Sequence, residues 1–176
     1  MLARGLISWI ARSQLQFAPR FVVSLSNRDR SHGSRKIHQR SPPINLKKAV
    51  PTIIVVFVVA NIFGFLIHAV LLKPDYMPLA QHYRAVGEEK MLFISLGYLS
   101  FAIGSVWVYA KGVEAKSWLG QGIRFGVAMW LVLAVPSFLI AYGVQPVPGM
   151  LAVKQVLFEG VDKILLGILT AALYRP

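Results

Sequence analysis

The chain has 176 residues, of which 56% are apolar and 15% charged, with a formal net charge of +12 and no cysteine. Soluble domains are typically about 45–50% apolar and about 25% charged. The lack of cysteine excludes disulfides, thiolate metal sites and cysteine nucleophiles. A soluble domain of this length could not bury the long apolar runs beyond residue 50 without exposing large apolar patches. The composition therefore indicates an integral membrane protein.

The positive charge is concentrated near the N-terminus. Residues 1–49 hold ten Lys or Arg and one acid, Asp29, which gives +9, whereas residues 50–176 hold nine bases and six acids, which gives +3. Basic residues beside an apolar run are typical of the cytoplasmic side of a membrane. The sequence contains no basic patch rich in the aromatic side chains that stack on nucleic-acid bases. We therefore expect the lipid bilayer and other membrane proteins as partners, and no nucleic acid.

Residues 1–49 are predicted to form a basic N-terminal arm. Residues 24–43 are polar and end in Ser-Pro-Pro, a composition typical of disorder. Three alternatives stay open. The true start site could lie near residues 46–48, or the arm could be an amphipathic helix on the membrane surface. Residues 1–28 also contain no acid and are rich in Arg and Ser, as mitochondrial transit peptides are.

Four apolar stretches follow, each near the ~20 residues that a helix needs to cross the hydrocarbon core. They cover residues 50–72, 91–110, 125–144 and 151–174. The first three contain no formal charge, while the fourth contains Lys154, Glu159, Asp162 and Lys163. We predict an all-α membrane protein, an up-down-up-down bundle of four transmembrane helices.

The distribution of Lys and Arg predicts the orientation of this bundle. If both termini lie inside, the inner side carries fourteen Lys or Arg and the outer side three. Cytoplasmic loops carry the excess of positive charge. Both termini are therefore predicted to be cytoplasmic, in a bacterial inner membrane. The alternative is a mitochondrial inner membrane, with both termini in the matrix.

Three short runs of residues resemble a family of small four-helix bacterial inner-membrane proteins. They are His68-x-x-x-x-Lys73-Pro74-Asp75-Tyr76 followed by Tyr83-Arg84, Gln121-Gly122-x-Arg124-Phe125-Gly126, and Val144-Gln145-Pro146-x-Pro148-Gly149. The resemblance covers roughly residues 48–175. It implies the four-helix fold and a membrane location. It implies no activity, because none is assigned to that family.

The charged residues of the fourth stretch are the main candidates for a functional site. Glu159, Asp162 and Lys163 lie on adjoining parts of one helical face, and Gln155 extends that face by one turn. A charge at the bilayer centre costs at least ~2.5–3.5 kcal/mol, so such residues are functional candidates. Two structural alternatives remain. Glu159 and Lys163 could pair within the helix, leaving Asp162 without a local partner, or the helix could begin later and leave residues 154–159 at the outer interface.

The first stretch contains a complementary polar stripe. Asn61, Gly64 and His68 share one face of a regular helix, and Asn61 should lie level with Asp162. His68 lies about 10 Å further out, level with Gln155 or Glu159. A histidine beside a carboxylate can relay protons or bind a metal. It can also be an ordinary interhelical hydrogen bond, worth about 0.6 kcal/mol. The candidate intramembrane polar site is Asn61, His68, Gln155, Glu159, Asp162 and Lys163.

Glycine and proline residues predict local features of the helices. The pairs Gly122-x-x-x-Gly126 and Ala60-x-x-x-Gly64 would allow neighbouring helices to approach closely. Pro136 cannot donate a hydrogen bond to the carbonyl of Val132, so a kink is expected near the middle of the third stretch.

The sequence contains none of the common catalytic or nucleotide-binding motifs. We therefore predict no catalytic residue, no cofactor and no metal site, and a membrane-embedded enzyme is the least favoured class. The favoured interpretation is a small structural or accessory membrane component. The alternative is a small transporter, channel or proton-coupled subunit that uses the acidic face of the fourth stretch.

Overall fold

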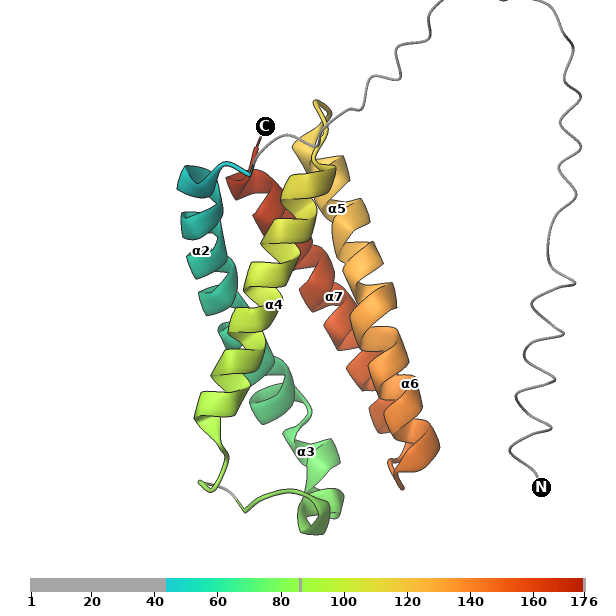
Figure 1. The fold of residues 1–176 in the computed structure, drawn as a ribbon. Helices are drawn as coiled ribbons and strands as arrows, with labels where there is room; N and C mark the ends of the chain where they lie inside the picture. The colour runs from blue at the N-terminus through green and yellow to red at the C-terminus, as the bar shows by residue number, and fades with distance from the viewer. Residues whose placement is uncertain (1–43, 86, 176) are drawn as a thin grey trace, which may run out of the picture. The chain divides into compact units, whose positions relative to one another are not determined.

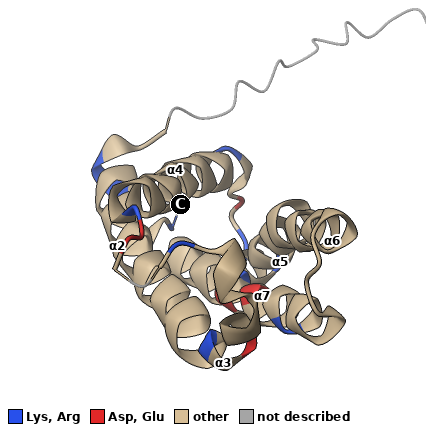
Figure 2. Ribbon diagram, turned by 90° about the horizontal axis from the view of Figure 1, so that it is seen from below, with Lys and Arg blue, Asp and Glu red and all other residues tan. Residues whose placement is uncertain are grey.

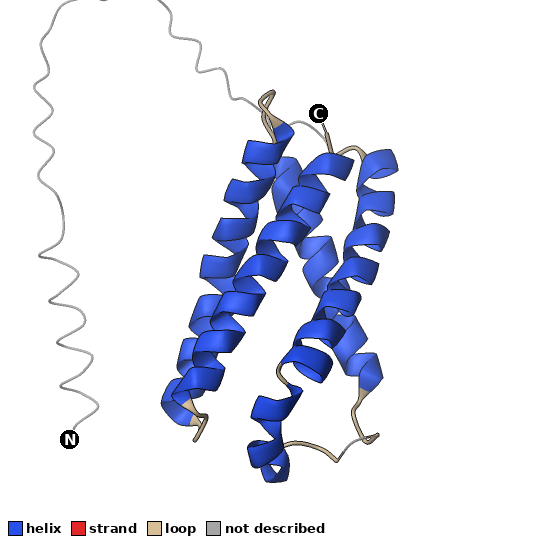
Figure 3. Cartoon of the chain, turned by 180° about the vertical axis from the view of Figure 1, so that it is seen from behind, coloured by secondary structure: helices blue, strands red, loops and turns tan. Residues whose placement is uncertain are grey.

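The computed structural model describes residues 44–85 and 87–175 (Figure 1). The predictions made for residues 1–43 lie outside this part of the chain. Throughout the described residues the regular structure is helical and contains no strand (Figure 3). The prediction of an all-α fold is confirmed. The predicted arm reaches too far, however, because residues 46–49 already belong to the first helix.

Four long helical stretches run side by side in the described part of the chain (Figure 1). The first is α2 (Leu46–Gly64) with the π-helix η1 (Phe65–Leu71), and the second is α4 (Met91–Gly112). The third consists of α5 (Trp118–Met129), the π-helix η3 (Trp130–Ala134) and α6 (Val135–Val144). The fourth is α7 (Gly149–Leu173).

Three of these stretches are long and apolar enough to cross a membrane. They are Leu46–Leu71, Met91–Gly112 and Trp118–Val144. The fourth, α7, has 25 residues but also four charged side chains, which distinguish it from the other three. Seen from the end of the bundle, Lys, Arg, Asp and Glu occupy only small parts of the ribbon (Figure 2). The chain is thus a helical protein with membrane-spanning capacity in at least three of its helical stretches.

The third stretch begins seven residues earlier than predicted, at Trp118 rather than at residue 125. Its polar residues are satisfied locally. Arg124 donates from Nε to the carbonyl of Gly120, and Gln121 binds the preceding loop with both ends of its amide. The prediction placed the start of this stretch after Arg124 because it relied on runs without charge, whereas the helix already includes Arg124.

The contact between α5 and α7 is the most extensive between any two helices. Its closest approach is made by glycines. A Cβ atom on Gly126 would lie 2.5 Å from the Cα of Ile164, and one on Gly122 would lie 2.7 Å from the Cα of Ile168. Gly167 of α7 faces both of them, since its Cβ would lie 2.5 Å from the carbonyl oxygen of Gly122. The predicted role of Gly122 and Gly126 is confirmed. This seam fixes the position of α7, which carries the candidate site.

On its other side α7 contacts α2, and α2 in turn packs on α4. Small side chains, among them Ala60 and Ala102, are buried in the core that these helices share. At Gly64 the space beside the helix is filled by the side chain of Tyr98 from α4 and not by the backbone of a neighbouring helix, so the close approach predicted for Ala60 and Gly64 is not seen at this glycine. The small residues let the first stretch lie close enough to α7 for their polar side chains to meet.

The structure differs from the prediction near Pro136 and between the first two helical stretches. Ahead of Pro136 the chain adopts the π-helix η3, in which the backbone N–H of Val135 bonds to the carbonyl of Trp130. The wider turn accommodates the missing donor of the proline. Between the first two predicted stretches, where no helix was predicted, the structure has two short helical segments, α3 (Lys73–Tyr76) and the 3₁₀-helix η2 (Met77–His82). Both segments have a proline in their first turn, where the proline N–H is not needed.

Candidate functional site

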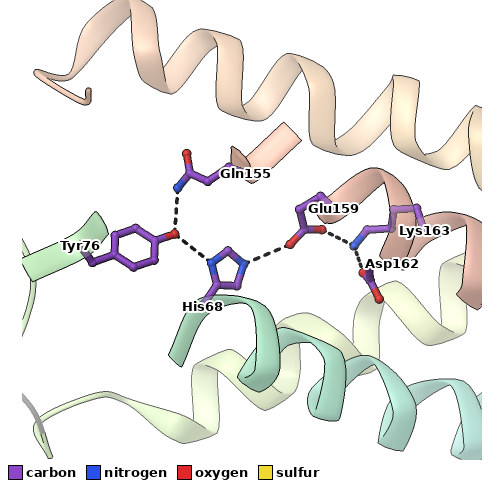
Figure 4. A network of polar contacts seen from close by, with 6 residues as sticks. All are labelled: His68, Tyr76, Gln155, Glu159, Asp162 and Lys163. Atoms are coloured by element: carbon purple, nitrogen blue, oxygen red, sulfur yellow. Dashed lines mark hydrogen bonds and ion pairs between the residues drawn. The ribbon is translucent and has the colours of Figure 1, made fainter. Parts of the chain in front are cut away.

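Six side chains from three segments form one connected set of hydrogen bonds inside the helical bundle. We call this set the polar network; its members are His68, Tyr76, Gln155, Glu159, Asp162 and Lys163 (Figure 4). Five of the six residues were predicted from the sequence. The sixth, Tyr76, was not assigned to the site.

Lys163 is the centre of the charged half of the network. Its ammonium group donates to Oε2 of Glu159 and to Oδ2 of Asp162, both at 2.5 Å. The three side chains are only 11%, 12% and 5% exposed for Lys163, Glu159 and Asp162. The predicted pair of Glu159 and Lys163 therefore exists. The expectation that Asp162 would lack a local partner is wrong, because Lys163 is long enough to reach both carboxylates.

One atom of this charged half has no partner. Oδ1 of Asp162 is buried and accepts no hydrogen bond from the described residues. A buried polar atom without a partner loses its hydration without compensation. The ammonium of Lys163 also lies 5.2 Å from the centre of the Phe101 ring, so α4 covers the group from the other side. The charged half is thus enclosed by the helices, and one of its carboxylate oxygens could still accept a hydrogen bond.

His68 joins the first helical stretch to α7. Its Nε2 atom lies 3.1 Å from Oε1 of Glu159, and its Nδ1 atom lies 2.9 Å from the hydroxyl oxygen of Tyr76. His68 was predicted to lie at the same depth in the bundle as Gln155 or Glu159, and its contact with Glu159 agrees with this prediction. The imidazole is one-third exposed, at the edge of the enclosed group.

Tyr76 connects His68 to Gln155. The amide Nε2 of Gln155 donates to the Tyr76 hydroxyl over 2.8 Å. Burial raises the pKa of the Tyr76 phenol above its ordinary value of 10.0, so this group keeps its proton at neutral pH. With a neutral imidazole, Tyr76 donates to Nδ1 of His68, and the Nε2–H of His68 donates to Glu159. With a protonated imidazole both ring nitrogens donate, and Tyr76 accepts from His68 and from Gln155.

Asn61 does not join the network, contrary to the prediction. Its side-chain amide donates to the carbonyl of Phe57, one turn earlier in the same helix, at 2.8 Å. The reason is the geometry of the backbone between Asn61 and His68. The prediction assumed a regular helix, but η1 begins at Phe65, and its wider turn changes the direction of His68 relative to Asn61. A local bond then satisfies the amide of Asn61 at less cost than a reach across helices.

A second ion pair lies next to the network and was also missed. The ammonium of Lys154 contacts both carboxylate oxygens of Asp75, at 2.8 and 2.9 Å. Lys154 and Asp75 are 79 positions apart, which is why no periodic pattern could reveal the pair. The available signal was the run Lys73-Pro74-Asp75-Tyr76, in which a proline turns the chain back immediately after an apolar stretch. Short helix α3 thereby brings Asp75 and Tyr76 against α7.

The charges of the polar network do not balance. Glu159 and Asp162 are two carboxylates and Lys163 is one fixed cation, so the group carries a net −1 when His68 is neutral. One additional proton makes it neutral. The groups that could receive this proton include His68 and the unpartnered Oδ1 of Asp162. Within the described residues no cluster of His, Asp and Glu has the arrangement of a metal site.

Comparison with known proteins found no matching family model, no matching curated protein and no matching solved structure. The resemblance to four-helix bacterial inner-membrane proteins therefore stays a prediction.

Proposed function

We propose that this chain is a four-span integral membrane protein whose polar network binds and passes on a proton, so that it acts as a small proton-coupled membrane component. The observation that carries this proposal is the network itself. It is continuous from Tyr76 to Asp162, and it holds two carboxylates against one lysine. A net charge inside a bilayer costs at least about 2.5–3.5 kcal/mol, and binding one proton removes it.

The same pairing supports α7 as the fourth span. Its 25 residues measure roughly 37 Å at 1.5 Å per residue, longer than the ~30 Å hydrocarbon core. Lys163 partly neutralises Glu159 and Asp162, and Lys154 is paired with Asp75, so the charges that distinguish α7 from the other stretches are largely compensated. The excess of Lys and Arg favours an orientation with both termini in the cytoplasm of a bacterium, or in the mitochondrial matrix as the alternative.

The first test measures proton flux. The purified chain would be reconstituted into liposomes that contain a pH-sensitive dye, and flux would be driven by a potassium diffusion potential. Asp162→Asn should abolish the flux, because the network then holds one carboxylate and one lysine and needs no further proton. Glu114→Gln is the matched control, because this carboxylate is exposed in the loop between α4 and α5. Unchanged flux in Asp162→Asn, or no flux above that of empty liposomes, would refute the proposal.

A second candidate is the structural or accessory component favoured by the sequence. The observation in its favour is that the network is almost fully satisfied by the chain itself, so its only role could be to hold α7 against the first stretch and α3. In that case Asp162→Asn should weaken co-purification with a larger membrane complex, and the liposomes should show no flux in any variant.

Cysteine labelling separates the two candidates, because the chain contains no cysteine of its own. Single cysteines would be introduced at positions 155, 159, 162 and 163 and exposed to a membrane-impermeant thiol reagent. Labelling at 159 or 162 would mean that water reaches the charged half of the network, as proton transfer requires. Protection at both positions, with labelling only at 155 or nowhere, would favour the accessory component.

A further inference from the structure

The end of the bundle that is remote from Tyr76 is strongly basic. The start of α2, the end of α4, the start of α5 and the end of α7 meet there. They bring together six bases and a single acid, Glu114; the bases are Lys47, Lys48, Lys111, Lys116, Arg124 and Arg175. The opposite end carries four bases and three acids, namely Lys73, Arg84, Lys90 and Lys154 with Asp75, Glu88 and Glu89. This end, which we call the basic end, would attract anions.

A pocket of about 400 Å³ lies at the basic end, between α4 and α5. Its lining includes the charged residues Glu114, Lys116 and Arg124 and the aromatic residues Tyr109 and Phe125. From α5 the lining takes Gln121, Arg124 and Phe125, which lie one to two turns inside the helix. The lining therefore carries two bases and one acid, a net charge of +1, together with apolar and aromatic side chains.

The structure holds this pocket in a defined shape. The amide of Gln121 accepts from the backbone N–H of Glu114 and donates to the carbonyls of Glu114 and Lys116, at 2.8 to 3.0 Å. These three bonds fix the loop that carries Lys116. Arg124 donates from Nε to the carbonyl of Gly120, which holds its guanidinium group in place. Lys116 is paired with Glu114, but both side chains are exposed, so another anion can compete for the ammonium group.

An independent observation points to a missing partner in the pocket. Tyr109 lines it and is only 5% exposed, yet its hydroxyl group has no hydrogen-bond partner among the described residues. The ring is held edge-on by Phe125, with 5.2 Å between ring centres, and by Tyr174, at 6.4 Å. Buried hydroxyl groups normally have a partner, and phenylalanine would fill this position without an unpaired hydroxyl. The hydroxyl is fully buried, so a ligand in the pocket would reach it only where the side chains that cover it move apart, and it would then supply the missing partner.

We propose that this pocket binds the phosphate group of an anionic phospholipid. Arg124 and Lys116 would supply charge, Tyr109 a neutral hydrogen bond, and the apolar side chains a surface for the lipid chains. A guanidinium group binds phosphate with two parallel hydrogen bonds, which suits Arg124 to this ligand. The position at the ends of membrane-spanning helices is the level of lipid headgroups, where free phosphate has no advantage over a lipid.

The test measures binding of phosphatidylglycerol to the purified chain in detergent, by native mass spectrometry. Arg124→Gln should weaken binding about tenfold, which corresponds to one charge-assisted contact. Tyr109→Phe should weaken binding about fivefold, which corresponds to one neutral hydrogen bond, and it preserves the packing of the ring. Arg84→Gln is the matched control, because Arg84 is an exposed base at the opposite end.

Three results would overturn the proposal. They are equal binding by the Arg124→Gln and Arg84→Gln variants, wild-type binding by Tyr109→Phe, and phosphatidylcholine bound as tightly as phosphatidylglycerol. Inorganic phosphate added as a competitor distinguishes the sources of the anion. Weak competition at millimolar concentration would support the lipid, whereas complete displacement would show that free phosphate occupies the pocket and overturn the assignment to a lipid.

Discussion

Replacing Gly126 by alanine should test whether the glycine seam between α5 and α7 holds the fold. A methyl group at this position would lie 2.5 Å from the Cα of Ile164, 2.5 Å from the carbonyl oxygen of Lys163 and 3.0 Å from the backbone N of Ile164. All three are backbone atoms, so no side chain can rotate away to make room. The helices must separate, and α7 carries the polar network with it.

The magnitude follows from two opposing effects. Overpacking of a closely packed site costs about 1–3 kcal/mol. Alanine is also favoured over glycine in a helix interior by up to about 1 kcal/mol, which would offset part of that cost. Gly104 of α4 provides the control, because a methyl group there meets no atom within 4 Å. Gly104→Ala should therefore gain helix propensity without any overpacking. The free energies of unfolding of the two variants should then differ by about 1–3 kcal/mol.

The assay is equilibrium unfolding in mixed micelles, with increasing sodium dodecyl sulfate and with tryptophan fluorescence as the signal. Gly126→Ala should unfold at a lower fraction of dodecyl sulfate than the wild type, and Gly104→Ala at an equal or higher one. If Gly126→Ala is as stable as Gly104→Ala, the helices are not in backbone contact at this seam and the reasoning fails.

Two further predictions concern side-chain contacts outside the polar network. Trp130→Phe removes the 2.8 Å hydrogen bond from the indole N–H to the carbonyl of Val156. In the same unfolding assay this variant should be less stable than the wild type by about 0.5–1.5 kcal/mol. Equal stability of the two proteins would mean that the fold does not depend on this bond. Lys116 lowers the pKa of Glu114 by hydrogen bonding and by its charge, so Lys116→Gln should raise that pKa towards its ordinary value, as carboxyl NMR would show. Because the pKa of Glu114 is lower in the folded state, the ion pair contributes to stability at neutral pH, and this contribution disappears as the pH falls through the folded-state pKa. If the pKa of Glu114 is the same in Lys116→Gln as in the wild type, the two side chains are not paired.

Some of these features could be read from the sequence because they repeat locally. The apolar runs predict helices of membrane-spanning length, and three of them are confirmed as long and apolar enough. The spacing of Gly122 and Gly126 predicts a close helix contact, and that of Glu159 and Lys163 predicts an ion pair; both occur in the structure. Spacings of three or four residues within one helix are enough to predict such contacts, since the helix places these residues side by side.

Other features could not be predicted because they depend on departures from regular geometry. Nothing in the residue types marks residues 65–71 as a π-helix, and this segment separates His68 from the face of Asn61. The sequence predicts no helix between residues 72 and 91, whereas residues 73–82 form the helical turns that carry Tyr76. A short helix of four residues has no periodic pattern from which its existence or direction could be inferred.

The sequence by itself determined the composition of the helices, the concentration of positive charge near the N-terminus and the placement of two carboxylates and a lysine on one helical face. These follow from the order of residues and the period of the α-helix. Only the tertiary structure decided which side chains complete the site. Tyr76 and Gln155 are 79 positions apart, and His68 and Glu159 are 91 apart. Such pairs meet because α7 packs against the first helical stretch as well as against α5, and this arrangement depends on the packed bundle rather than on any one helix.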